Sequence, residues 1–271
     1  MTDTVKISRA ALHMWEEPCV SGEKGSGTVF FSGCNMKCVF CQNKEISTGG
    51  FGREITVERL ADIFLELQDK GALNINLVTP THYTLQIIDA VKMAREKGLK
   101  LPIVYNTSSY EKVETIKMLE GVVDVWLPDF KYMDNAVAKK YSKAADYVDC
   151  ATVAIDEMVR QQPECVFDKD GIIQKGVIVR HLVLPGNLIN SKQALRYLHD
   201  TYGDSIYIGI MSQYTPCTDL DEYPEINRRL TEDEYERIIK FARKIGIEKA
   251  YIQEGKCAEE SFIPPFDNEG V

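Results

Sequence analysis

Three cysteines within eight residues of one another are the feature of this chain with the clearest chemistry. They are Cys34, Cys38 and Cys41, in the pattern CxxxCxxC. Clustered cysteine thiolates are the usual ligands of iron–sulfur clusters, which ordinarily take four of them. No fourth cysteine lies nearby in the sequence. The loop therefore predicts a 4Fe-4S cluster whose fourth iron is open to another molecule, as catalytic zinc sites also keep one position open.

Two alternatives to an open cluster remain at this point. Cys19 as a distant fourth ligand would turn the cluster into a closed electron-transfer centre. A zinc ribbon would need a second paired CxxC knuckle, which the chain lacks.

Residues 1–9 are polar and have no apolar core of a secretory signal. We therefore expect a cytoplasmic protein whose eight cysteines are reduced thiols rather than disulfides.

The cysteine loop follows the first of a series of apolar runs that alternate with helical patterns. The predicted strands span residues 27–32, 73–78, 101–105, 122–127, 176–184, 206–211 and 250–253, with a small hairpin over 166–173. The predicted helices span residues 56–70, 84–97, 110–120, 135–161 (broken), 191–201 and 231–245, with Thr56 as the N-cap of the first. Such alternation predicts parallel strands joined by helices. A partial (β/α)6 barrel fits best, and a doubly wound sheet remains the alternative.

Length and composition predict one globular domain. The chain has 271 residues, 44% of them hydrophobic, and a net charge of −9. We divide it into an N-terminal segment (1–26), a barrel core (27–253) and a C-terminal strap (254–271). The acidic balance argues against a nucleic-acid partner. No apolar run approaches the 18 or so residues that a membrane span needs.

Several motifs together resemble the radical S-adenosylmethionine (SAM) superfamily, in the branch related to pyruvate formate-lyase activating enzyme. These motifs are EEPCVSG, GSGTVFFSGCNMKCVFCQN, VTPTHY, VYNTSSY, LPDFKY, IVRHLVLPGN, MSQYTP and FIPPFD. The resemblance implies a 4Fe-4S cluster and S-adenosyl-L-methionine as cofactors. It also implies an oxidoreductase that cleaves SAM reductively to a deoxyadenosyl radical, which abstracts hydrogen from a substrate. The implied partners are a glycyl-radical enzyme or another protein or peptide, and an electron donor such as flavodoxin or ferredoxin.

The resemblance also implies roles for residues near the cysteine loop. The three cysteines match the cluster ligands, and Phe40 matches the aromatic residue that contacts adenine. Thr79 and Thr81 stand where most family members carry a Gly-Gly-Glu motif facing the SAM amino group. The resemblance therefore does not identify the residue of this chain that contacts the amino group. Asn106 and Thr107 are placed to contact the ribose or the methionine part. Alternatively, the threonines only shape a turn and Asn106 caps a helix.

Two later strands carry charged candidates. Asp129 and Lys131 resemble the DxK motif of activating enzymes, with Lys131 as a point charge for the SAM carboxylate. A surface ion pair of little consequence is the alternative. Because side chains alternate along a strand, Arg180 or His181 faces the barrel interior, but not both. We favour Arg180, as a contact for a carboxylate.

The remaining candidates lie late in the chain or before the cysteine loop. Met211 and Gln213 follow the sixth strand and are placed to line the adenine. Gln253 and Glu254 end the last strand and are candidates for substrate contacts, as is Cys19.

A helix before the loop would place His13 and Glu17 one turn apart, on a face that is as readily solvated as functional. Three functions stay open: a glycyl-radical-enzyme activase, radical modification of a peptide or small metabolite, and a non-enzymatic iron–sulfur redox protein.

Overall fold

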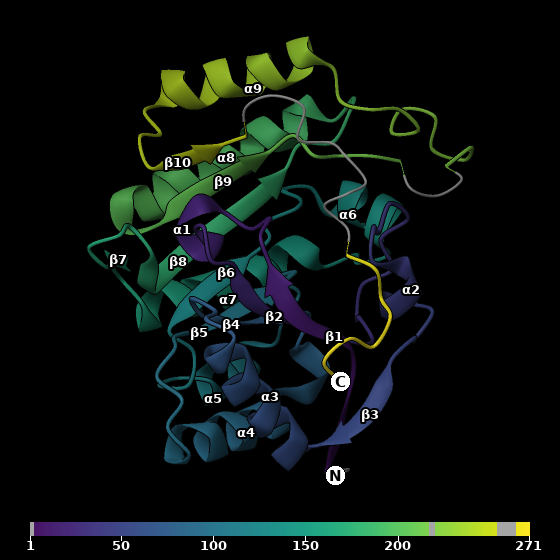
Figure 1. Ribbon diagram of the computed structural model, residues 1–271. Coiled ribbons are helices and arrows are strands. Elements are labelled where there is room, and N and C mark those ends of the chain that lie inside the picture. The colour runs from purple at the N-terminus through teal and green to yellow at the C-terminus, as the bar shows by residue number, and fades with distance from the viewer. Residues whose placement is uncertain (1–2, 217–219, 254–263) are drawn as a thin grey trace.

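A computed structural model describes residues 3–216, 220–253 and 264–271 of the chain. Its described strands form one sheet in the order β10-β9-β8-β6-β5-β4-β2-β1-β3, with β7 paired to β8 (Figure 1). Seven strands are parallel: β2 (Ser26–Phe31), β4 (Ile75–Val78), β5 (Ile103–Thr107), β6 (Val125–Pro128), β8 (Ile173–Leu182), β9 (Tyr207–Met211) and β10 (Ala250–Ile252). These seven strands neighbour one another in chain order, without the reversal of a doubly wound sheet. The predicted partial barrel is confirmed.

Helices connect the parallel strands and cover the outside of the curved sheet (Figure 1). They are α3 (Val57–Asp69), α4 (Thr84–Glu96), α5 (Val113–Met118), α6 (Asn135–Ser142), α7 (Tyr147–Gln161), α8 (Leu188–Tyr202) and α9 (Glu232–Ile245). Short helical turns complete the set: α1 (Pro18–Ser21), α2 (Lys44–Ser47), η1 (Thr81–Tyr83) and η2 (Gly203–Ser205). The predicted break in residues 135–161 is the turn between α6 and α7.

Local sequence signals explain where several elements begin. The Thr56 hydroxyl accepts a hydrogen bond from the backbone N–H of Arg59, so the predicted N-cap of α3 is confirmed. Thr231 and Glu234 form a reciprocal capping box at the start of α9. The predicted hairpin is β7 (Val166–Phe167) paired with β8, and Gly171 in its turn has a φ of 77°.

The N-terminal segment differs from the expectation. A helix that carries His13 and Glu17 is wrong, because residues Thr4–His13 form strand β1, antiparallel to β2. Strand β3 (Arg53–Thr56) pairs with the far edge of β1. The physical reason is that β2 would otherwise leave its backbone groups unpaired at a sheet edge. Residues 264–271 lie along β1, where the N–H of Ala10 donates to the carbonyl of Glu269 at 2.8 Å.

Two apolar layers hold the sheet. The outer layer packs Trp126, Val179 and their neighbours against the helices. The inner layer fills the lower barrel with side chains of alternate strand positions and of α1: Cys19, Val20, Val104, Val125, Leu127, Ile173 and Ile178. Because strand side chains alternate, the next inward positions along the strands lie one layer higher. That upper layer is polar.

Candidate active site

A cavity of about 250 Å³ opens at the carboxyl ends of the parallel strands. Its floor is the polar layer, which consists of Asn106 on β5, Asp129 after β6 and Arg180 on β8. Its mouth is formed by the cysteine loop after β2. Further lining residues that the sequence predicted are Phe40, Thr79, Thr107, Lys131, Met211 and Gln213. The strand ends thus bring together most candidates, as expected for barrels of this type.

The three cysteines of the loop all line the cavity, and each is partly buried. Two of the sulfurs receive hydrogen bonds: the Ser142 hydroxyl donates to Cys38 Sγ at 3.0 Å, and the N–H of Met36 donates to Cys34 Sγ at 3.4 Å. Burial raises the pKa of Cys38 to about 11, although Lys131 and Ser142 act in the opposite direction. Donors aimed at sulfur favour the thiolate form that metals bind.

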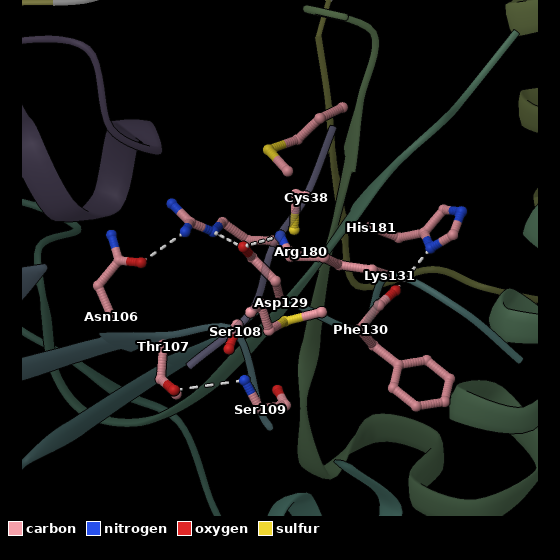
Figure 2. A network of polar contacts seen from close by, with 12 residues as sticks. Cys38, Asn106, Thr107, Ser108, Ser109, Asp129, Phe130, Lys131, Arg180 and His181 are labelled. Carbon is pink, nitrogen blue, oxygen red and sulfur yellow. Dashed lines mark hydrogen bonds and ion pairs between the residues drawn. The ribbon is translucent and has the colours of Figure 1, made fainter. Parts of the chain in front are cut away.

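Arg180 is the centre of the cavity floor. Its Nε donates to Asp129 Oδ1 at 2.9 Å, and one terminal nitrogen donates to Asn106 Oδ1 at 2.6 Å. Its other terminal nitrogen donates to Glu16 Oε2 at 3.2 Å. Figure 2 shows the neighbouring His181 turned away toward Phe130, where Nδ1–H donates to the backbone carbonyl at 2.7 Å. Only Arg180 of this pair faces the interior, as the alternation rule required.

Lys131 and Asp129 form a second ion pair beside this centre, with Nζ to Oδ2 at 2.5 Å (Figure 2). Burial alone would raise the pKa of Asp129, but Arg180 and Lys131 outweigh it and hold that pKa low. Burial alone would lower the pKa of Lys131, but Asp129 and Cys38 outweigh it and raise that pKa. Tyr147 fixes the loop, because its hydroxyl accepts from the N–H of Lys131 at 2.9 Å. The charged state of both side chains is therefore the stable one.

Glu17, for which the sequence left a solvated and a functional role equally open, and its neighbour Glu16 lie in the barrel interior. Glu16 lines the cavity and accepts from Asn76 Nδ2 at 2.9 Å as well as from Arg180. Burial raises the pKa of Glu17 to about 7, against the attraction of Arg180. Gly209 on β9 leaves room for Glu17, since a Cβ there would lie 3.2 Å from its carboxylate. The only sequence signal was the EEPCVSG motif.

Two loops on the β4 and β5 side of the cavity are joined by a carboxylate that the sequence did not single out. Thr81 and Thr107 each donate a hydroxyl hydrogen to Glu111 Oε1 at 2.7 Å. Thr107 lines the cavity, whereas Thr81 does not belong to its described lining. Thr79 lines the cavity with a φ of 56°, which is a rare backbone conformation for a β-branched residue.

Of the remaining candidates, some line the cavity and others lie outside its described lining. Gln253 does not belong to the described lining, and its amide nitrogen donates to Gln213 Oε1 at 3.2 Å. Cys19 is buried in the inner apolar layer, where burial raises its pKa to about 12. Glu254 lies outside the described residues. Phe40 packs edge to face against Tyr214, with ring centroids 5.8 Å apart.

The donor set fits an iron–sulfur cluster with an open iron. Three thiols face one cavity, and no further cysteine of the described chain lines it. Within that same part of the chain, no three His, Cys, Asp or Glu side chains converge on a point where one ion would bind. A 4Fe-4S cluster does not require such convergence, because each cysteine binds a different iron.

Comparison with known proteins identifies the family. The model of the Radical SAM superfamily matches residues 28–167, which is 140 of the 271 residues. The chain belongs to the radical SAM superfamily. The predicted membership is thus confirmed, and it implies SAM and a 4Fe-4S cluster as cofactors. No helix in residues 3–216, 220–253 and 264–271 is both long and apolar enough to cross a bilayer.

Two individual proteins are similar to this chain in sequence. The chain is 32% identical over 249 residues to the uncharacterized protein MJ0674 of Methanocaldococcus jannaschii, covering 89% of this chain and 68% of that protein. It is 30% identical over 129 residues to MJ1227 of the same organism, whose name assigns it provisionally to glycyl-radical-enzyme activation. That match covers 47% of this chain and 49% of MJ1227. The predicted kinship with activating enzymes is confirmed as a distant one.

Among solved structures, HydG, a maturase of the FeFe-hydrogenase, aligns with a TM-score of 0.57 and 13% identity. The alignment covers 87% of this chain and 54% of HydG, so the chain spans about half the length of that protein. At this identity the likeness shows the shared fold alone.

Proposed function

We propose that this protein is a radical SAM enzyme that acts on a polypeptide, with activation of a glycyl-radical enzyme as its specific task. The observation that carries the chemical part is the convergence of three cysteine thiols and the Lys131–Asp129 pair on one cavity. When bound, a reduced 4Fe-4S cluster supplies the electron that cleaves SAM and so generates the hydrogen-abstracting radical.

The residues of this chain would bind, orient and shield the reactants. Cys34, Cys38 and Cys41 would hold three irons, and the Lys131 ammonium is fixed beside Cys38 by Asp129. From that position Lys131 is a point charge for a ligand carboxylate. The apolar side chains of the cavity wall exclude water from the reacting centre.

Arg180 remains our candidate for a further carboxylate contact. Within the described part of the chain, three of its five N–H donors are bonded to protein side chains, and the other two are proposed for a ligand. Asn106, Thr107 and Thr79 are proposed for the methionine and ribose parts. Phe40, Met211 and Gln213 are proposed for adenine.

The polypeptide part of the proposal rests on the charge and shape of the cavity. The cationic side chains in its described lining are Lys131 and Arg180, and both are bound to Asp129. In this proposal both side chains serve the carboxylate of SAM, so a strongly anionic substrate such as a phosphorylated metabolite would find no further cation in the described lining. The lining also includes Trp15 and Pro264, and the side chain of Trp15 is 58% exposed. An uncharged segment of backbone fits such a wall better than a charged metabolite.

Anaerobic reconstitution with iron and sulfide tests the chemical part. Addition of SAM should perturb the EPR signal of the reduced cluster, and the reduced protein should release 5′-deoxyadenosine. Cys38→Ala should abolish both, whereas Cys150→Ala on α7 should not, because that thiol contacts Asp146 outside the cavity. A well-formed cluster that ignores SAM would contradict the proposal. A glycyl radical formed on a partner enzyme, seen by EPR, tests the specific task.

A further inference from the structure

The β4 and β5 side of the cavity presents a hydrogen-bond acceptor whose orientation is fixed from behind. The Thr107 hydroxyl donates its single hydrogen to Glu111 and also accepts from the N–H of Ser109 at 3.3 Å. A hydroxyl has one hydrogen and two lone pairs. Thr107 therefore has only a lone pair left to offer a ligand in the cavity that it lines.

The carboxylate behind this acceptor is buried, and one of its oxygens is able to accept further hydrogen bonds. Glu111 is 5% exposed, and its Oε2 has no hydrogen-bond partner among the described residues. No ion pair of the described chain includes Glu111, although Thr81 and Tyr105 share its other oxygen with Thr107. A buried carboxylate without a counter-charge is costly. A cation bound close by would offset that cost.

The segment that carries this carboxylate contacts the cysteine loop. The side-chain amide of Asn35, next to Cys34, donates to the backbone carbonyl of Tyr110 at 2.6 Å. Tyr110 directly precedes Glu111 in the sequence. The segment that carries Glu111 is therefore held against the cysteine loop.

We propose that Glu111 is a positioning residue that makes this side of the cavity specific for a primary ammonium group. An ammonium has three donors and no acceptor, which matches an oriented acceptor in a negative field. Glu111 acts through the hydroxyl of Thr107 and, by holding Thr81, through the loop that carries Thr79. This inference rests on the proposed function, because the ammonium that the site would hold is the amino group of SAM.

Two ligands separate recognition of the ammonium from recognition of the nucleoside. SAM carries the amino-acid part, whereas methylthioadenosine lacks it and keeps the adenosine and the sulfur. Binding of each is measured by anaerobic calorimetry on the reconstituted protein. Glu111→Gln keeps a carbonyl acceptor for the threonines but removes the charge. This variant should lower the affinity for SAM at least fivefold more than the affinity for methylthioadenosine.

Controls make the result decisive. Glu157→Gln changes a buried glutamate on α7, bonded to Arg160 and Gln161, and should leave both affinities unchanged. If Glu111→Gln does not fold, Thr107→Val carries the same expectation. A relative loss smaller than fivefold, or an equal loss for both ligands, overturns the role of Glu111 while the proposed function stands. A wild-type protein that binds no SAM overturns the proposed function, and this inference with it.

Discussion

Replacement of Arg180 by methionine should lower the free energy of unfolding by about 3–5 kcal/mol, the usual cost of removing one partner from a buried ion pair. The Arg180 side chain is 13% exposed and bonds to two carboxylates and the Asn106 amide. Methionine preserves most of the packing of the stem but donates no hydrogen bond. Glu16 and Asp129, 10% and 17% exposed, would then keep one other partner each.

Urea denaturation followed by circular dichroism at neutral pH measures this loss. Arg160→Met is the matched control, because Arg160 on α7 is 53% exposed in its ion pairs. Exposed pairs contribute only about 0–1 kcal/mol each, so the control should lose little. The double variant Arg180→Met/Glu16→Gln should lose less than the sum of the single losses, by about 1–3 kcal/mol, because the two residues are in contact. Strict additivity, or a loss for Arg180→Met no larger than the control's, would refute the central role of Arg180.

Three further predictions concern the same floor and the barrel base. Burial raises the pKa of Glu17 from 4.5 to about 7, so the unfolded chain ionises first and the wild type loses stability as pH rises between these values. Glu17→Gln should remove this loss of about 3 kcal/mol. The difference in urea midpoint between the variant and the wild type should therefore change between acidic and alkaline pH. An equal difference at both pH values contradicts the prediction. Tyr147→Phe leaves a buried backbone N–H without its acceptor and should cost about 1–3 kcal/mol; an unchanged melting temperature argues against this. Gly176→Ala would place a methyl carbon 2.6 Å from the Cys165 sulfur and should cost about 1–3 kcal/mol beyond Gly171→Ala, which also has positive φ but open space. Equal melting temperatures of the two alanine variants would exclude the steric cause.

Local patterns in the sequence were sufficient for the parallel core. Apolar spacing placed the helices, Thr56 marked the start of α3, and the alternation of strands and helices required parallel pairing. These signals are local, because hydrogen bonds within helices and the two-residue period of strands depend on neighbours in the chain. Strand β1 was missed because its mixed polarity is explained only by its place between β2 and β3.

The candidate site divides in the same way. The cysteine spacing, the alternation that turns Arg180 inward, and the charged residues after β6 could all be predicted from the sequence. Glu16 was not, since it reaches Arg180 across 164 residues of chain. Glu111 likewise gained significance only when two loops met over its carboxylate.

By itself, the sequence determined the alternation of strands and helices and the three thiols after the first parallel strand, because both follow from spacing along the chain. Only the tertiary structure decided which carboxylates neutralise the buried cations. Curvature of the sheet brings the N-terminal segment under β8 and β9, and no local period encodes that approach.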